Sequence, residues 1–493
     1  MHAEPQHSMP AHPGCRPHAI AGAAAGLLAL LCATAAADPS AAAVKAQPTA
    51  VSSARAVNQH SARAARDLGA IITLRTVDVG APGNAPVGIV PFTDAIYRSC
   101  ADAPTTSKGC QTVGGTEYPY EIGQVDITVA QYVDFLNTVN ATGRDPYRLY
   151  NEVESSTAWP KYGQIDFSAA RPAGKHYWAA YPEWNDKPYG FTTFLSAARF
   201  VNSLNNGRVL SMQESTSGRF RYASYRIRLS QRTETGMYNL TRPGATRTAT
   251  SGFVVPSQNE WIKAAYYDPQ GGGTYSYWKY PTNPGAFGDG TATAPSAALL
   301  NPANGNVTNS ATQPLANYHA SGLPAPSWCP SQVPAKACST VNPLGLSPTT
   351  YASLYQGSLS SVGQAATTSP WGTLDQGGNA VEWTDTITPP PAGQGSARVW
   401  RRAHGGVANS PGYQMWLSAV GLAPEDDAVL TRAYPWYGFR IGVIGNLVPP
   451  TAQEPEVLAQ TGTDLPGLAT LSLTGLTAGS VLLLSRRRLS RKL

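Results

Sequence analysis

Residues 375–383, Asp-Gln-Gly-Gly-Asn-Ala-Val-Glu-Trp, are the stretch of this 493-residue sequence that decides its fold. The Gly-Gly pair suits a tight loop, because glycine adopts backbone conformations that other residues avoid. A second Glu-Trp pair, Glu260-Trp261, lies upstream, and two such pairs invite an acid–base interpretation. However, Ser257 and Glu260 have the spacing of a helix capping box, which explains Glu260 without catalysis. We therefore assign no catalytic residue.

Three more sequence blocks flank this stretch. Residues 120–137 contain Tyr-Glu-Ile-Gly, Asp-Ile-Thr and Phe-Leu-Asn, and residues 255–265 contain Val-Pro-Ser-Gln-Asn-Glu-Trp. The last block starts at Arg398-Val399, passes through Gly405-Gly406 and closes at Gly438-Phe439-Arg440. Four specific blocks in one order along the chain are a far stronger signal than any one of them alone.

Together these blocks resemble the formylglycine-generating enzyme family, also called the sulfatase-modifying factor family, over about residues 118–445. The resemblance implies a C-type-lectin-like fold, which is an irregular, loop-rich α+β domain. We expect one such domain over residues 71–448. The hydrophobic pattern predicts helices at 128–139, at 196–204 and from 257 onward, and strands at 70–77, 120–127, 219–229 and 437–444.

The family resemblance also implies that the Gly-Gly loop binds calcium. Asp375 and Glu382 would supply carboxylate ligands, and Gly378 and Ala380 would supply backbone carbonyls. A donor set made only of oxygen suits Ca²⁺. Asp375 stands where the family usually has asparagine, and it is an equally good oxygen donor. The alternative is a structural turn in which Glu382 caps backbone amides.

The copper chemistry of the family is not expected in this chain. The formylglycine-generating reaction uses two cysteines, five residues apart, that bind copper(I) after the Gly-Gly pair of the last block. Counted from Gly405-Gly406, those positions hold Ser410 and Met415, and neither side chain is a thiolate. Iron bound by histidines, as in the ergothioneine branch of the family, is not expected either. No two histidines of residues 38–461 are three or four positions apart.

Four residues of this region are candidates to line a groove where the family has its active site: His404, Ser410, Met415 and Trp416. A lone histidine such as His404 is by default a satisfied loop or surface residue. Aromatic side chains nearby could form a stacking surface for a ligand. We expect at least half of the tryptophans among these aromatic residues to belong to the core. The aromatic residues are Trp371, Trp383, Trp400, Trp416, Trp436 and Tyr437.

The N-terminus predicts export. Residues 1–37 combine a weakly basic start, an apolar run and small residues, which is the pattern of a signal peptide cleaved between Ala37 and Asp38. A retained membrane anchor is the alternative, but the apolar run falls short of the about 20 residues that a helical span needs. Residues 38–70 are rich in Ala, Ser and Gln, and we interpret them as a disordered linker.

The C-terminus predicts a surface anchor. Residues 458–493 begin with Leu-Ala-Gln-Thr-Gly, after a Pro- and Glu-containing spacer at 449–457. Residues 465–484 are uncharged and long enough to span a bilayer, and an Arg-rich tail follows. The arrangement resembles an LAxTG sortase signal. It implies that a sortase cuts between Thr461 and Gly462 and joins Thr461 to a cell-wall peptidoglycan precursor. A plain tail-anchor helix is one alternative, and an exosortase-type tail, suggested by Glu454-Pro455-Glu456 before the span, is another.

The net charge of +6 does not indicate a nucleic-acid partner. Residues 462–493 hold one Asp against four Arg and one Lys, so most of the positive charge lies in the predicted anchor. The predicted mature part is nearly neutral, and a basic pI that comes from an anchor says nothing about nucleic acid.

The cysteines predict disulfide bonds. Two of the six, Cys15 and Cys32, lie in the predicted signal peptide. An even number of remaining cysteines in an exported chain favours disulfides, and four cysteines allow three connectivities. The simplest connectivity joins neighbours in the sequence, which are Cys100 with Cys110 and Cys329 with Cys338.

Three hypotheses for the function follow. We favour an exported, surface-anchored module without catalytic activity, whose lectin-like domain binds a glycan, a peptide or a wall polymer. The second hypothesis is an oxidase or modifying enzyme of the same family with a divergent active site. The third is a purely architectural protein of the cell wall.

Overall fold

The computed structural model describes residues 68–90, 110–151, 154, 164–271, 276–287, 292–300, 306–309, 313–318, 359–390, 397–408, 412–426 and 437–447. Over these residues the protein is a loop-rich α+β domain, as predicted. The predicted signal peptide, the spacer and the sorting signal lie outside the described residues, and so do Ser410, Trp436, Cys100, Cys329 and Cys338. Cys110 forms a disulfide. None of the helices within the described ranges is long and apolar enough to cross a membrane.

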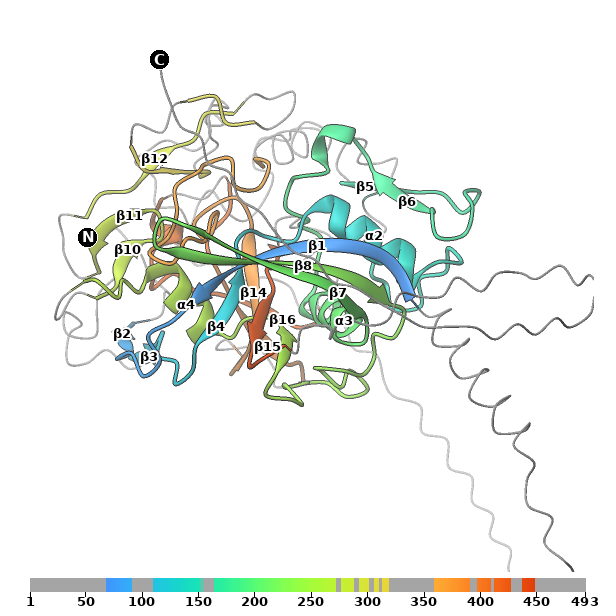
Figure 1. Cartoon of the computed structure of the whole chain (residues 1–493), viewed down its shortest axis with the longest axis horizontal. Coiled ribbons are helices and arrows are strands. Elements are labelled where there is room, and N and C mark those ends of the chain that lie inside the picture. Colours follow the sequence, from blue (N-terminus) through green and yellow to red (C-terminus); the bar gives the residue numbers. More distant parts are fainter. Residues whose placement is uncertain are drawn as a thin grey trace, which may run out of the picture. The chain divides into compact units, whose positions relative to one another are not determined.

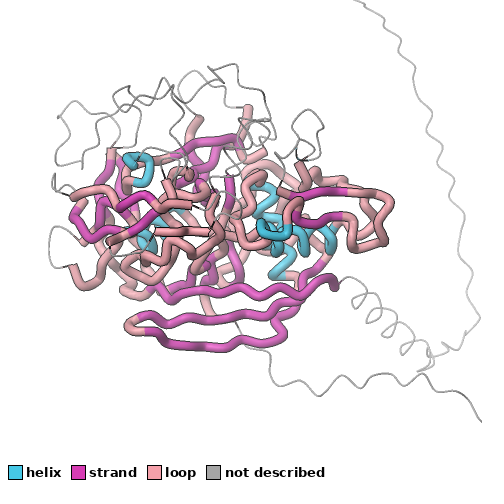
Figure 2. Tube along the Cα trace, turned by 90° about the horizontal axis from the view of Figure 1, so that it is seen from above, coloured by secondary structure: helices cyan, strands magenta, loops and turns pink. Residues whose placement is uncertain are grey.

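The main sheet has six strands in the order β7-β8-β1-β4-β18-β9, and all neighbours are antiparallel. Figures 1 and 2 show β1, β7 and β8 as long strands side by side, with β7 at the edge. The pairing of β4 with β18 brings the first and last sequence blocks together. The strands are β1 Leu68–Val79, β4 Tyr120–Gly123, β7 Arg208–Ser217, β8 Phe220–Ser230, β9 Gly252–Val254 and β18 Gly442–Ile444.

A second sheet has four strands in the order β16-β15-β14-β17. Its inner strand β14 begins with the last three residues of the segment 375–383, which we call the nonapeptide. Its strands are β14 Val381–Thr388, β15 Trp400–His404, β16 Gly421–Pro424 and β17 Tyr437–Gly438. Four short pairs complete the strands: β2 Val87–Ile89 with β3 Gln111–Val113, β5 Ile165–Phe167 with β6 Tyr177–Ala179, β10 Trp278–Tyr280 with β11 Asn283–Ala286, and β12 Ser296–Ala297 with β13 Leu315–Ala316. There are also two 3₁₀ turns in the described ranges. The turn η2 Pro182–Trp184 follows β6, and the turn η5 Gly412–Met415 lies between β15 and β16.

The helices begin where the sequence has capping residues. The hydroxyl of Thr128 accepts a hydrogen bond from the backbone N–H of Gln131 and caps the first helix. Ser257 does the same with the N–H of Glu260, so the predicted capping box is confirmed. The middle helix begins two residues earlier than predicted, because Thr193 caps it. The helices are α2 Val129–Val139, α3 Phe194–Asn205 and α4 Gln258–Tyr266.

Two predicted strands are shorter than expected. The strand predicted at 120–127 ends at Gly123, because the N–H of Gln124 donates to the carbonyl of Arg75 and the chain turns toward α2. The strand predicted at 437–444 is split into β17 and β18, because Arg440 between them turns into the core. Strands β14 and β15 were not predicted at all.

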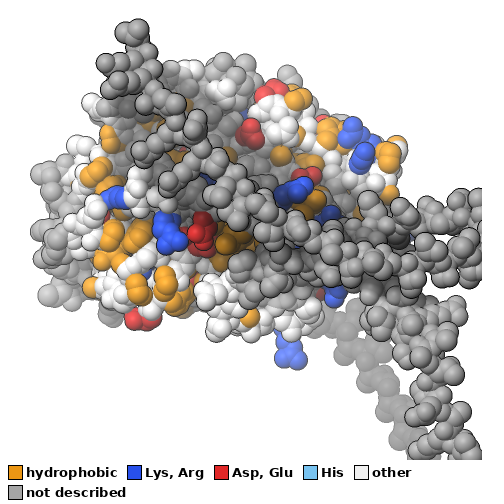
Figure 3. All heavy atoms as spheres, viewed as in Figure 1, with side chains coloured by type: hydrophobic (Ala, Val, Ile, Leu, Met, Phe, Trp, Pro, Cys, Tyr) orange, Lys and Arg blue, Asp and Glu red, His pale blue; other side chains and the backbone are white. Residues whose placement is uncertain are grey.

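The core lies between the main sheet and its helices. Helix α2 packs against β1, and α3 packs against β8 and β9. Tyr132 of α2 stacks on Tyr189 with ring centroids 4.0 Å apart, and Phe135 and Phe200 pack beside them. On the face seen in Figure 3, hydrophobic, basic and acidic side chains of the described residues are interspersed.

Candidate functional site

A buried ion pair lies beneath the nonapeptide. Glu382 is the second residue of β14, and Arg440 comes from the turn between β17 and β18. The guanidinium donates to both carboxylate oxygens of Glu382, at 2.5 Å and 2.7 Å, and also to the carbonyls of Gly123 and Leu374. The indole N–H of Trp261 donates to Glu382 at 2.9 Å. Because bidentate, charge-assisted hydrogen bonds are strong, this pair joins four segments of the chain.

Two more carboxylates lie close to this ion pair. Asp126 is 3.9 Å from the Arg440 guanidinium, and neither of its oxygens has a hydrogen-bond partner among the described residues. Burial, together with the negative charge of Glu382, raises the pKa of Asp126 well above its usual value. Asp375 accepts a hydrogen bond from the N–H of Gly363 at 2.5 Å, and burial raises its pKa to about 6. The cluster therefore holds three carboxylates around one guanidinium.

The loop that precedes β14 has an unusual backbone conformation. Asp375, Gly378 and Asn379 have positive φ angles of 58°, 88° and 62°. The backbone of Gly378 passes against Asn317, and a Cβ at Gly378 would overlap the Asn317 carbonyl. The Asn379 amide accepts hydrogen bonds from Asn317 and from the backbone of Ser360, both at 3.0 Å. Asn379 therefore fixes the loop conformation, as a non-glycine residue in this region needs surrounding contacts to persist.

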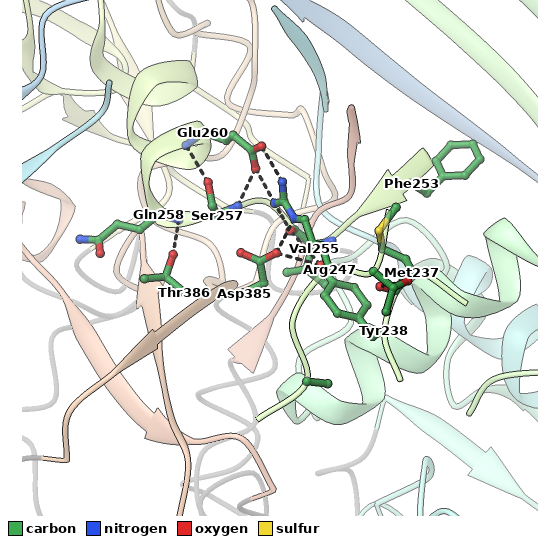
Figure 4. Close-up of polar contacts among 12 residues, drawn as sticks. Met237, Tyr238, Arg247, Phe253, Val255, Ser257, Gln258, Glu260, Asp385 and Thr386 are labelled. Atoms are coloured by element: carbon green, nitrogen blue, oxygen red, sulfur yellow. Dashed lines mark hydrogen bonds and ion pairs between the residues drawn. The ribbon is translucent and has the colours of Figure 1, made fainter. Parts of the chain in front are cut away.

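A second buried network lies farther along β14, and Figure 4 shows it. Arg247 donates to both oxygens of Glu260, at 2.7 Å and 2.8 Å, and to Asp385 at 2.6 Å. Tyr118 donates to Glu260, and Tyr238 donates to Asp385. Glu260 also completes the capping box of α4, and Arg247 lowers its pKa against the effect of burial. This network explains the second Glu-Trp pair as structure, in agreement with the sequence interpretation.

His404 is a core residue. It lies opposite Glu382 on the neighbouring strand β15, and its ring stacks on Trp261 with centroids 5.2 Å apart. Burial, followed by the nearby charge of Arg402, lowers the pKa of His404 to about 3. The imidazole is therefore neutral across the physiological pH range and packs as an aromatic ring. This corrects the expectation that His404 is a loop or surface residue that lines a groove.

Comparison with known protein families shows which family this chain belongs to. Residues 114–441 match the family described as the sulfatase-modifying factor enzyme 1-like domain, which is more than half of the chain. The chain belongs to this family. A search of curated protein sequences finds no match.

Three solved structures are similar to this chain at low sequence identity. Variable protein 1 of Treponema denticola is 13% identical, with a TM-score of 0.34, over 76% of this chain and 99% of that chain. CarF is 15% identical, with a TM-score of 0.30, over 76% and 99% of the two chains. PvdO from Pseudomonas aeruginosa is 12% identical, with a TM-score of 0.36, over 76% and 98%.

The calcium ligands that the family resemblance implies lie together, but their side chains are engaged elsewhere. Both oxygens of Glu382 contact Arg440, and Asp375 accepts from a backbone N–H. Within the described ranges, no group of three or more His, Cys, Asp or Glu side chains is placed to hold a metal ion. As arranged, the carboxylates of Asp375 and Glu382 belong to the ion-pair cluster around Arg440. Calcium at Asp375, Gly378, Ala380 and Glu382 stays a prediction, and Glu382 caps no backbone amide among the described contacts.

The second of the two positions that correspond to the family's copper cysteines is buried. Met415 has no exposed side chain and packs with Tyr280 and Ala316, which corrects its prediction as a groove residue. Trp416, the next residue, is partly exposed, and the amine of Lys279 lies 4.4 Å from its ring. Trp383 is buried and donates to the carbonyl of Thr192, so it belongs to the core.

The sequence analysis assigned no role to Arg440, Asp126 or Trp261, although all three lie within the blocks that carry the resemblance. The signal for Arg440 is the last residue of the Gly-Phe-Arg block, since an arginine among apolar neighbours needs a buried acid. Nothing local in the sequence pairs it with Glu382, which is 58 residues away.

We expect Asp375→Asn to stabilise the protein at alkaline pH. The pKa of Asp375 is raised to about 6 in the folded state, so the folded protein binds the proton of this carboxyl more tightly than the unfolded chain does. The resulting cost is absent at low pH, appears as the pH rises past the usual value of 3.8, and is complete above about 6. Asparagine keeps an oxygen for the Gly363 N–H and carries no charge. The advantage of the variant should therefore grow by about 1–3 kcal/mol between pH 4 and pH 8.

Urea denaturation at several pH values in the presence of a chelator measures this effect. A variant whose advantage does not change with pH would contradict the assignment. Repeating the series with calcium tests the predicted ion, because a ligand that binds the folded state raises its stability. A bound calcium ion would reverse the sign, making the wild type the more stable protein in calcium.

Proposed function

We propose that this chain is a non-catalytic member of the sulfatase-modifying factor family. It is exported, held at the cell surface by its C-terminus, and binds a glycan, a peptide or a wall polymer. The observation that carries the proposal is the pair of positions that the family uses for copper(I). They hold Ser410 and Met415, and the Met415 side chain is packed into a small hydrophobic cluster. Thiolates are the ligands that copper(I) prefers, and a buried thioether with a hydroxyl does not replace them.

The chemistry of the remaining buried groups supports the same proposal. Glu382, Glu260 and Glu425 each accept hydrogen bonds from a buried or partly buried arginine, so each has a structural partner. His404 is held neutral and packed against Trp261. An acid–base group must be able to reach its substrate, and side chains that are held in buried ion pairs or packed in the core do not. The export and anchoring parts of the proposal rest on the two terminal sequence patterns, with a sortase and a wall precursor as processing partners.

Copper binding and oxygen uptake test the proposal. Purified protein incubated with one equivalent of copper(I) should retain far less than one equivalent after desalting, and it should consume no oxygen with a cysteine-containing peptide. The double variant Ser410→Cys/Met415→Cys restores the two thiols and serves as the matched control. Copper retained by the double variant alone would locate the difference at these two positions.

The same protein on an array of glycans, peptides and wall polymers should bind at least one class. Stoichiometric copper together with oxygen uptake by the wild type would overturn the proposal in favour of an oxidase with a divergent site. A blank array together with no oxygen uptake would leave the architectural hypothesis.

A further inference from the structure

The open edge of the main sheet carries a group of arginines on one face. In the register of β8 with its neighbours, Arg228 lies opposite Arg208 of β7. Arg226 lies opposite Thr73 of β1, and Arg75 lies two residues farther along that strand. Because residues two apart on a strand, and residues directly opposite each other on neighbouring strands, share a face, these four arginines share one face of the sheet. We call Arg75, Arg208, Arg226 and Arg228 the arginine face.

The other face of the same strands is the core face. Leu74, Tyr225 and Ile227 alternate with the arginines and are buried. On the arginine face, by contrast, Arg75, Arg208 and Arg226 are exposed and Arg228 is partly exposed. The arginine side chains therefore face solvent from three adjacent strands, which Figure 2 shows side by side.

The acidic residues nearest in these strands pair with Arg221, and not with Arg226 or Arg228. Asp78 and Glu214 both contact Arg221, at 3.4 Å and 3.7 Å, and Arg221 alternates with the arginine face and lies on the opposite side of β8. Over the described residues, neither Arg226 nor Arg228 has a carboxylate within 4 Å. Arg226 and Arg228 therefore present two positive charges on one face of β8 with no carboxylate of the described residues beside them, and an anion on this face would offset their mutual repulsion.

The spacing of the charges indicates an extended anion. Arg226 and Arg228 are about 7 Å apart along the strand, and Arg208 lies about 5 Å across from Arg228. Arg75 continues the series diagonally on β1, about 8 Å from Arg226. The four arginine positions thus follow a path of about 20 Å along the backbone, with one position roughly every 5–8 Å. Such a path is too long for a single small anion and suits a linear polymer with regularly spaced charges.

The other side chains on this face favour a polymer with hydroxyl groups. Thr73, Ser211, Gln213 and Ser224 lie between the arginines and offer hydroxyl and amide groups to sugar or polyol hydroxyls. Two aromatic rings, Tyr222 and Phe220, lie on this face and contact each other with ring centroids 6.3 Å apart. Tyr222 is buried, and the guanidinium of Arg75 covers it at 4.4 Å from the ring centroid, so the ring beside the arginines is not open to stack on bases. This argues against single-stranded nucleic acid, which uses open aromatic rings as stacking platforms.

We propose that the arginine face binds a linear anionic glycopolymer that carries one phosphate or carboxylate group per repeat. Guanidinium groups make bidentate hydrogen bonds with both anions, so the two sources share one recognition chemistry. The inference rests on the proposed function as a binding module and names its ligand class and surface. The edge position of β7 leaves the polymer free to continue past the sheet on the β7 side.

Binding to purified polymers tests the inference. The probes are a polyol-phosphate polymer, polygalacturonate, neutral dextran and double-stranded DNA, each with full-length protein. Wild-type protein should bind at least one of the two anionic polymers and not dextran, and its affinity should fall steeply between about 50 and about 200 mM salt. The double variant Arg226→Gln/Arg228→Gln should weaken this binding about tenfold or more.

Arg221→Gln is the matched control, because it removes an exposed arginine from the opposite face of the same strand. It should change the affinity less than about twofold, since its side chain already pairs with acids. The variant Arg226→Lys/Arg228→Lys keeps the charges and should retain part of the binding. Melting temperatures within a few degrees of the wild type show that the variants are folded.

Three results would overturn the inference. If the double glutamine variant binds as the wild type does, the surface is wrong, although the binding function stands. If DNA binds as tightly as the better anionic polymer and depends on the same arginines, the ligand class is wrong. If neither anionic polymer binds, the inference fails, and only a blank array of neutral glycans and peptides would also remove the proposed function.

Discussion

Replacing Arg440 by methionine should lower the free energy of unfolding by about 3–5 kcal/mol, because it leaves buried carboxylates without their cation. The guanidinium contacts both oxygens of Glu382 and lies 3.9 Å from Asp126. The side chains of all three residues are completely buried. Methionine fills a similar volume, so the loss reports on charge and hydrogen bonding more than on a cavity. Denaturant titration near neutral pH measures the change.

Arg398→Met is the matched control. Arg398 pairs with Asp426 at 2.7 Å, but the two side chains are 43% and 55% exposed. An exposed pair contributes at most about 1 kcal/mol, so the control should be nearly neutral. The double variant Arg440→Met/Glu382→Gln should recover part of the loss, because it removes the stranded charge along with the cation. Equal losses for Arg398→Met and Arg440→Met would show that Arg440 acts through something other than the buried pair.

The parts of the fold that the sequence predicts well are those fixed by neighbouring residues. The N-caps Thr128 and Ser257 and the helices that follow them depend on contacts three or four residues apart. The long strands β1 and β8 are recognisable because apolar residues alternate along them. Local patterns of this kind are sufficient for elements that would form a similar structure in many folds.

The parts that the sequence does not predict depend on distant partners. Strands β14 and β15 form the centre of the second sheet, but their residues become buried only through pairing with each other and with β17. The ion pair between Glu382 and Arg440 and the stacking of Trp261 on His404 likewise join segments far apart in the chain. A single histidine has no pattern that distinguishes a core ring from a groove residue, so the environment of His404 came only from the structure.

The family's copper site and the proposed polymer-binding site lie in different parts of the domain. By the sequence resemblance, the family's copper positions correspond to Ser410 and Met415, and Met415 packs with Tyr280 inside the domain. The arginine face lies on β1, β7 and β8 of the main sheet, and none of these strands contains a sequence block that carries the family resemblance. Only the neighbouring strand β4 does. If both proposals hold, this chain keeps the scaffold of its family and differs in function, because function resides in sites and not in the fold.

Gly378→Ala should also be strongly destabilising, by about 2–5 kcal/mol, and it tests the loop of the nonapeptide directly. Gly378 has a φ of 88°, which L-residues rarely adopt, and a Cβ there would overlap the carbonyl of Asn317. The overlap is with backbone, so a side-chain rotation does not relieve it. The loop would have to move away from Asn317 and break the hydrogen bonds of Asn379 to Asn317 and Ser360.

Gly218→Ala separates the two causes of this loss. Gly218 lies in the turn between β7 and β8 with a φ of 59°, and a Cβ there would meet no atom within 4 Å. The control therefore carries the cost of the backbone conformation alone, about 1 kcal/mol. The difference between the two variants in the free energy of unfolding isolates the close approach to Asn317. If both glycines tolerate alanine equally, the nonapeptide loop does not pack against Asn317 in solution. Other contacts would then have to hold the buried ion pair of Glu382 and Arg440 in place.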